Sequence, residues 1–176
     1  MPRLEQWIAR MLQWDQAACL RLNRGLRVRW LRLLLKAASR LGDGVFWYAL
    51  LAALLALHGW EALGPLLHIL LTGGACTALY KWLKHRTLRP RPYQVMQAIR
   101  AGADPLDRFS FPSGHTLHAV AFSILASAWF PETAWVAWPF TCLVAISLPV
   151  LGLHYPSDVL AGAAIGAAVA ALSLTL

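Results

Sequence analysis

Three short polar clusters contain most of the side chains that can do chemistry. They are KHRTLRPRP at 84–92, FPSGH at 111–115 and SLPVLGLHYPSD at 147–158. Arginine and lysine bind phosphate oxygens, and the free N–H groups at the start of a helix bind anions. A neutral histidine is a nucleophile and also carries protons near neutral pH. Together the clusters indicate a phosphate site that contains a nucleophile.

Each cluster also has a simpler explanation when it is taken alone. A basic run beside a membrane span binds anionic lipid headgroups or fixes topology. Pro112, Ser113 and Gly114 before an apolar run are typical of a helix start with Ser113 as the N-cap. His154 and Asp158 lie four positions apart, which suits a structural hydrogen bond. The phosphate hypothesis therefore depends on the three clusters meeting at one face of the molecule.

The order and spacing of the clusters resemble the signature of the type 2 phosphatidate phosphatase family. That family also includes undecaprenyl pyrophosphate phosphatases and vanadium haloperoxidases. Lys84 is followed after six residues by Arg91 and Pro92, the PSGH run comes next, and Ser147 is followed seven positions later by His154. The resemblance covers about residues 84–158 and implies a metal-independent membrane phosphatase that needs no cofactor.

The resemblance also implies a role for each matching residue. His154 would attack phosphorus and form a phosphohistidine while Asp158 holds its other ring nitrogen. His115 would protonate the leaving oxygen and then activate water. The phosphoryl oxygens would be held by cationic and helix-terminal groups: Lys84, Arg91, Ser113 and Gly114. Further phosphate or headgroup contacts are expected from nearby loop residues, namely His85, Arg86, Arg89 and Arg108, whereas Asp104 and Asp107 are expected to cap or solvate the loop.

One position departs from the family pattern. The family has an arginine after the serine of the third cluster, and this chain has Leu148. Losing one preorganised donor typically lowers the rate of an enzyme by about 10²–10³. The departure leaves an alternative open, in which the chain is a non-catalytic or inactivated member that binds lipid phosphate.

The composition favours a membrane protein. Of the 176 residues, 59% are apolar and 14% are charged, and the mean hydropathy is +0.52. An average soluble domain has about 45–50% apolar and about 25% charged residues. The net charge of +8 could indicate nucleic acid, but no lysine or arginine occurs from Phe109 to Leu176. A soluble surface needs charge there and a bilayer does not, so we expect lipid, and no nucleic acid, as the partner.

Five apolar segments are about long enough to cross the hydrocarbon layer as helices, which takes about 20 residues. They are 44–60, 63–83, 113–131, 133–151 and 156–176. The predicted fold class is all-α, a multi-span membrane helical bundle with about five spanning helices, or six. With five spans, the loop 84–112, the turn 152–156 and the N-terminus lie on one side of the membrane. Gly162 and Gly166 give the last segment a small face that lets another helix approach closely.

Residues 1–43 carry nine of the 16 lysines and arginines and are too charged to span a membrane. We expect them to form basic amphipathic helices that lie in the headgroup plane, before a membrane-embedded phosphatase domain at 44–176. The alternative for 22–41 is a partly buried sixth helix. Trp47 and Trp60 fall near the expected span ends, where an indole suits the membrane interface.

The sequence therefore predicts an integral membrane phosphatase for a lipid phosphate or pyrophosphate. The candidate substrates are undecaprenyl pyrophosphate, phosphatidate and phosphatidylglycerophosphate, with the lipid chain entering sideways from the bilayer. The expected location is the bacterial cytoplasmic membrane, and the oligomeric state stays open. The basic clusters favour a cytoplasmic site by the positive-inside rule. The family resemblance implies an extracytoplasmic site instead, so the side of the membrane stays open as well.

Overall fold

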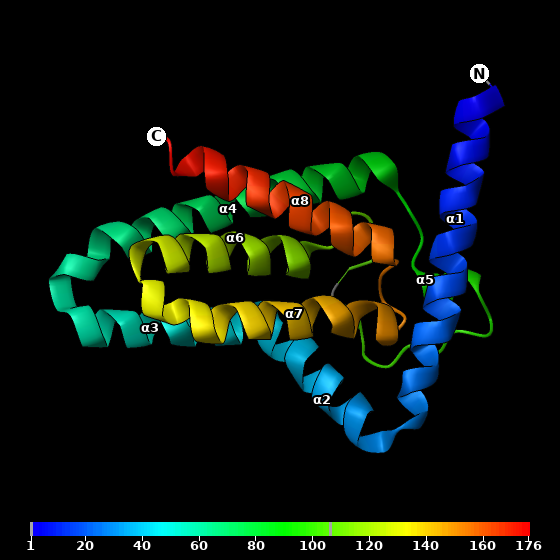
Figure 1. Cartoon of the computed structure of the whole chain (residues 1–176), viewed down its shortest axis with the longest axis horizontal. Helices are drawn as coiled ribbons and strands as arrows, with labels where there is room; N and C mark the ends of the chain where they lie inside the picture. Colours follow the sequence, from blue (N-terminus) through cyan, green and yellow to red (C-terminus); the bar gives the residue numbers. More distant parts are fainter. Residues whose placement is uncertain (1, 106) are drawn as a thin grey trace.

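The computed structural model describes residues 2–105 and 107–176, and the secondary structure of these residues is helical. Figure 1 follows the chain from α1 to α8. The helices are α1 (Pro2–Asn23), α2 (Arg29–Arg40), α3 (Phe46–His58), α4 (Leu63–Thr87), α5 (Pro92–Val95), α6 (Gly114–Trp129), α7 (Ala134–Val150) and α8 (Pro156–Ser173). Short 3-10 turns connect several of them, at Arg24–Arg27, Gly59–Ala62 and Pro131–Thr133, and a kinked segment, Leu41–Val45, joins α2 to α3.

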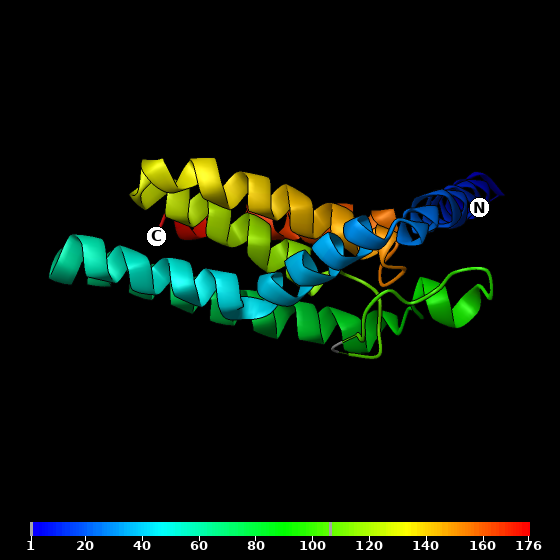
Figure 2. The same ribbon diagram turned by 90° about the horizontal axis from the view of Figure 1, so that it is seen from below.

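The long helices form a two-layered bundle. Seen from below, α3 and α4 make one layer, and α6, α7 and α8 make the other (Figure 2). The helix α1 crosses one end of the bundle, and α2 leads obliquely from α1 into α3 (Figure 1). The connection between α4 and α6 lies at the same end as the turn between α7 and α8. The expectation that these two polar segments share one end of the bundle is thus confirmed.

Among the described residues, three helical stretches are long and apolar enough to cross a membrane. They are Arg29–Val95, Pro131–Val150 and Pro156–Ser173, and the first of them contains α3 and α4. The five segments expected to span coincide with α3, α4, α6, α7 and α8 to within a few residues at most ends. The described part of the chain is thus all-helical and contains candidate membrane-spanning stretches, while the number of crossings stays a prediction.

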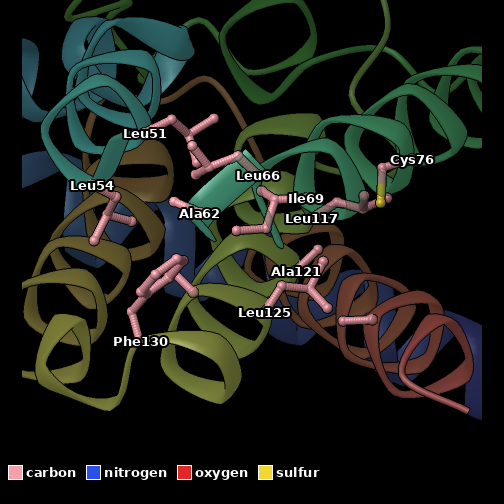
Figure 3. Close-up of a cluster of buried hydrophobic side chains, with 12 residues drawn as sticks. Leu51, Leu54, Ala62, Leu66, Ile69, Cys76, Leu117, Ala121, Leu125 and Phe130 are labelled. Atoms are coloured by element: carbon pink, nitrogen blue, oxygen red, sulfur yellow. The ribbon is translucent and has the colours of Figure 1, made fainter. Parts of the chain in front are cut away.

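A continuous apolar core joins the two layers. Leu51 of α3 and Ile69 of α4 pack in the same cluster as Leu117 and Leu125 of α6 (Figure 3). Ile69, Leu117 and Leu125 are completely buried. Each large aliphatic side chain buried in this way contributes about 1.5–3 kcal/mol to folding. The core therefore fixes how far α4 is displaced along its axis relative to α6. The same packing positions the ends of both helices that carry polar groups.

The glycines of α8 bring it against α6, as the small-residue pattern predicted. A Cβ atom added to Gly162 would lie 2.5 Å from the carbonyl oxygen of Ser113. A Cβ added to Gly166 would approach the carbonyl oxygen of Leu117 even more closely. Only glycine permits this backbone contact. The first turn of α8 therefore lies against the first turn of α6.

The N-terminal helices pack on this bundle. Leu35 of α2 is buried in a cluster with Leu148 and Leu151, and Asp15 and Cys19 of α1 are buried as well. The helix α2 is thus partly buried, in line with the alternative for 22–41. The placement of α1 and α2 in the headgroup plane, and the division at residue 43, stay predictions.

The prediction for Trp47 is wrong. Its side chain is 2% exposed and packs against the aromatic rings of Phe46, Phe122 and Phe140. An indole can occupy a core when other rings surround it, because the aromatic contacts replace the interface contacts. Trp60, by contrast, is exposed at the far end of the bundle from the polar segments.

Candidate active site

The polar clusters meet at the end of the bundle where α4 ends and where α6 and α8 begin (Figure 1). The backbone N–H of Ser113 donates to the carbonyl oxygen of Asp158 at 3.1 Å. The hydroxyl of Ser113 accepts the N–H of Thr116 at 3.3 Å, so Ser113 is the N-cap of α6, as expected. Gly114 follows as the first helical residue and lines a cavity. The second and third clusters are thus in direct contact.

The turn before α8 places His154. Gly152 has φ +72°, a left-handed conformation that favours glycine, and it turns the chain back so that His154 is 1% exposed. Arg91 Nη1 lies 3.2 Å from His154 Nε2, and His154 Nδ1 lies 3.7 Å from Asp158 Oδ2. A guanidinium can only donate, so Nε2 is the acceptor and the ring proton is on Nδ1, on the side of Asp158.

The charge state of His154 follows from its surroundings. Burial lowers the pKa of His154 to about 4, and Arg91 and Lys84 act in the same direction. The nearby Asp158 carboxylate acts against this shift but does not reverse it. The imidazole is therefore neutral at physiological pH, which is the form that attacks phosphorus.

Asp158 is held from several sides. It is completely buried and accepts hydrogen bonds from the Tyr155 N–H at 2.8 Å, from the Ser110 hydroxyl and from Arg89 Nη1 at 2.6 Å. The guanidinium of Arg89 also lies over the ring of Tyr155. Arg89, expected as a phosphate or headgroup contact, instead binds the carboxylate beside the histidine.

Sequence reasoning missed Asp15, which completes this network. Asp15 Oδ2 accepts from Arg89 Nη2 at 2.7 Å, and its Oδ1 accepts from the Ser157 N–H at 3.0 Å. Asp15 is 2% exposed although it belongs to the basic N-terminal helix. A buried charge is tolerated only when it is paired, and here Arg89 is the partner. The signal in the sequence was an acid in the middle of a mainly basic, amphipathic helix.

Both cations expected to hold phosphate bind a carboxylate of the loop. Lys84 Nζ donates to Asp107 Oδ2 at 2.6 Å, and Arg91 Nη2 donates to Asp107 Oδ1 at 2.8 Å. Burial alone would raise the pKa of Asp107, but Lys84 and Arg91 hold it below its usual value. Asp107 is therefore an anion in the place where phosphate is expected. The sequence had predicted only that it caps or solvates the loop.

Lys84 lies in the last turn of α4 rather than after the helix. The helix was expected to end at about residue 83, and it continues to Thr87. Leu88 then takes a left-handed conformation with φ 50°, and the RPRP segment prevents any continuation. This extra turn buries Lys84 and directs it to Asp107 and to the carbonyl oxygen of Phe109.

A cavity of about 840 Å³ opens beside these residues. Lys84, Asp107 and His115 are among its lining residues, together with Trp47 and Phe122 deeper in the bundle. Its walls thus combine a polar end with an apolar part.

The other predicted contacts divide between this cavity and the outer surface. His85 and Arg108 also line the cavity. Arg86 lies over the ring of Trp82 and is not among the described residues that line it.

Sequence reasoning also missed Asp43. Asp43 Oδ1 lies 3.0 Å from His115 Nε2, and both side chains line the cavity. His115 is in the first turn of α6, next to Gly114. The available signal was an acid between two glycines at the start of an apolar segment.

Leu148 is completely buried in an apolar cluster with Leu35, Leu151 and Leu153. The guanidinium that reaches His154 comes from Arg91. Within residues 2–105 and 107–176, no group of three histidine, cysteine, aspartate or glutamate side chains could hold a metal ion. The expectation that catalysis needs no metal stays a prediction.

A family model, the PAP2 superfamily, matches residues 62–176. The chain belongs to the PAP2 superfamily. The resemblance drawn from the three clusters is thus confirmed. All three clusters lie within the matched region, whereas Asp15 and Asp43 lie before it.

The relatives of this PAP2 protein are phosphatases. Over 92 residues it is 35% identical to decaprenylphosphoryl-5-phosphoribose phosphatase of Mycobacterium tuberculosis, in strains CDC 1551 / Oshkosh and ATCC 25618 / H37Rv. This match covers 51% of this chain and 49% of the relative, so it spans about half the length of that curated protein.

Two solved structures have a similar fold. The first is a transmembrane PAP2-type phosphatidylglycerolphosphate phosphatase from Bacillus subtilis, with a TM-score of 0.75, 25% identity, and coverage of 94% of this chain and 85% of that one. The second is LpxE of Aquifex aeolicus, with a TM-score of 0.76, 25% identity, and coverage of 89% and 93%. The fold and the family together indicate an integral membrane protein of a phosphatase family.

Proposed function

We propose that this PAP2 protein hydrolyses a phosphate group from a membrane lipid phosphate or pyrophosphate through a phosphohistidine on His154. The observation that carries the proposal is the placement of this neutral, buried imidazole, with Arg91 at its Nε2 and Asp158 on its Nδ1 side. Arg91 marks the position where phosphoryl oxygens would lie, directly beside the attacking nitrogen. Asp158 would stabilise the positive charge that develops on the ring.

The reaction has two balanced steps. In the first, a bond forms between His154 Nε2 and phosphorus while the bond from phosphorus to the leaving oxygen breaks, and His115 gives that oxygen a proton. In the second, a water oxygen bonds to phosphorus as the nitrogen–phosphorus bond breaks, and His115 takes a proton from the water. One water molecule is consumed, and the products are inorganic phosphate and the lipid alcohol or lipid monophosphate.

The charges near His154 suit the phosphoryl group. Lys84 and Arg91 would hold its oxygens together with the helix start at Ser113 and Gly114. Preorganised cations of this kind stabilise the charge of the transition state, and we propose that they do so without a metal ion.

The cavity supports a lipid as the substrate. Its polar end holds Lys84 and His115, and its walls further in include Trp47, Leu70 and Phe122. The names of the relatives, which describe phosphatases of prenyl and glycerol lipids, support the same class. We therefore propose a substrate of the undecaprenyl pyrophosphate, phosphatidate or phosphatidylglycerophosphate class. The proposed location is the bacterial cytoplasmic membrane.

The test is phosphate release from these three lipids in detergent, with the full chain and with His154→Ala. The matched control is His68→Ala, since His68 lies near the start of α4, away from the site, and accepts a hydrogen bond from Trp129. We expect His154→Ala to lose at least about 10³-fold in rate, as for a removed nucleophile, and His68→Ala to stay within about twofold. Absence of phosphate release by the unaltered chain, or full activity of His154→Ala, would overturn the proposal.

A further inference from the structure

We infer that Asp43 is the positioning residue of His115, so that each catalytic histidine has its own carboxylate. This inference rests on the proposed function, in which His115 exchanges protons with the leaving group and with water. Asp43 acts through the imidazole and does not touch phosphorus. It would hold the ring in place and fix which ring nitrogen exchanges the proton.

The first observation is the contact itself. Asp43 Oδ1 lies 3.0 Å from His115 Nε2, and the side chains are 23% and 14% exposed. Asp43 and Asp107 are the two acids that line the cavity among the described residues, and Asp107 already binds Lys84 and Arg91. Asp43 is therefore the acid at the cavity that is available to His115.

The second observation is the backbone that presents Asp43. Residues Leu41–Val45 form a kinked connection between α2 and α3, in which Gly44 leaves the helical conformation with φ +131°. A side chain at Gly44 would be strained, and a Cβ atom at Gly42 would lie 2.8 Å from Val144 Cγ2 of α7. Glycine on both sides is thus required to place Asp43 where it is.

The chemistry explains why a carboxylate is useful there. A carboxylate that accepts one ring N–H of an imidazole fixes the orientation of the ring and the nitrogen that carries the other proton. When Asp43 holds the Nε2 proton, the proton on Nδ1 is the one that passes to the leaving oxygen as the phosphorus–oxygen bond breaks. In the second step Nδ1 takes a proton from the attacking water, and the pair returns to its first state.

A positioning role predicts a dependence on the leaving group. An alkyl alcohol is a poor leaving group and needs the proton, whereas a nitrophenolate leaves without one. Loss of a general acid therefore slows the hydrolysis of an alkyl phosphate much more than that of a nitrophenyl phosphate. A residue that only supports the fold would slow both reactions equally.

The experiment measures kcat/KM in detergent, because this ratio reports the transfer of the phosphoryl group to His154 and not the later hydrolysis of the phosphohistidine, which is the same for every substrate. The two substrates are dodecyl phosphate and a nitrophenyl phosphate that carries an alkyl chain of similar length. The variants are Asp43→Asn, Asp43→Glu and His115→Gln. The matched control is Glu132→Gln, because Glu132 pairs with His58 at 3.3 Å near the opposite end of the bundle. Thermal unfolding in detergent is followed for every variant, so that losses through misfolding are recognised.

We expect Asp43→Asn to lose about 10- to 100-fold in kcat/KM with dodecyl phosphate and less than about threefold with the nitrophenyl substrate, with His115→Gln showing the same pattern more strongly. Asp43→Glu is expected to recover part of the dodecyl phosphate rate, and Glu132→Gln to match the unaltered chain with both substrates.

Three outcomes would overturn the inference. In the first, His115→Gln slows the reaction of dodecyl phosphate more than that of the nitrophenyl substrate, but Asp43→Asn slows both equally or slows neither. This result would reject the role of Asp43 and leave the proposed function standing. Equal losses in His115→Gln would reject the proton transfer by His115 and the role of Asp43 with it. No release of phosphate by the unaltered chain from either substrate would reject the proposed function itself.

Discussion

Asp107 binds both of the cations, Lys84 and Arg91, that the proposed reaction needs to hold phosphate. Lys84 and Arg91 each donate to one of its oxygens, so the carboxylate lies between them much as two phosphoryl oxygens would. A phosphate that binds there must displace it. Asp107 is therefore expected to weaken substrate binding while it keeps the two cations in position when no substrate is bound.

Removing this charge tests the competition. We expect Asp107→Asn to lower both KM for the lipid phosphate and the inhibition constant of inorganic phosphate by about threefold to tenfold, the range of one charge-assisted hydrogen bond near a surface. Steady-state kinetics with added phosphate measures both. Asp104→Asn is the control, since Asp104 belongs to the same loop and is 87% exposed. A higher KM for Asp107→Asn would show that Asp107 supports the site and does not compete.

The neutral state of His154 predicts how activity depends on pH. Since its pKa is lowered to about 4, the nucleophile stays unprotonated far below the usual value of 6.5. After correction for the ionisation of the substrate, we expect kcat/KM to fall on the acid side only below about pH 5. A profile of kcat/KM from pH 4 to 8 measures this. An acid limb centred near pH 6.5 would contradict a buried, neutral imidazole.

The residues of the three clusters could be predicted because their types and spacing are local in the sequence. Ser113 as the N-cap and the approach of His154 to Asp158 needed only a few neighbouring residues. Asp15, Asp43 and Asp107 could not be predicted in their roles, because each acts through a partner that only the fold brings close. Asp15, for example, is 74 positions from Arg89.

At the scale of elements, the crossing of α6 and α8 holds the site together. Gly162 lets the first turn of α8 touch the backbone at Ser113. This contact brings Asp158 to the start of α6, and the turn before α8 carries His154 with it. Positions of helices expected from apolar segments were close to those observed, but the extra turn of α4 and the kink at Gly44 before α3 followed from tertiary packing and not from periodicity.

Substituting a single glycine tests this contact. Gly162→Ala forces the two helices apart, so we expect a loss of about 1–3 kcal/mol in the free energy of unfolding and at least about a tenfold loss in kcat. Gly64→Ala is the matched control, because a Cβ at Gly64 of α4 would meet nothing within 4 Å. Thermal unfolding in detergent and phosphate release measure the two effects. Equal behaviour of the two variants would contradict a close-packed crossing.

At the scale of the whole molecule, the N-terminal helix belongs to the site although it precedes the family-matched region. Asp15 of α1 binds Arg89, and Arg89 binds Asp158. The sequence predicted a basic helix in the headgroup plane, since its charge and amphipathic pattern are local features. The docking of its buried acid onto α8 depends on the complete fold and could not be predicted.

Neutralising this acid tests the connection. Asp15→Asn leaves Arg89 with one partner fewer, so we expect kcat to fall by about tenfold while KM changes by less than about twofold, because the network acts on Asp158 and not on the phosphate. Glu5→Gln, an exposed acid on the same helix, is the control. A change in KM alone would place Asp15 in substrate binding instead.

The most direct test of the account is to trap the covalent intermediate. In His115→Gln, the nitrophenyl substrate needs no acid for the first step, while the second step lacks its base, so a phosphoenzyme should accumulate. After an alkaline quench, mass spectrometry of the digested chain should find one added phosphoryl group on His154. Turnover of this substrate without any labelled histidine, or with the phosphoryl group on another residue, would contradict attack by His154.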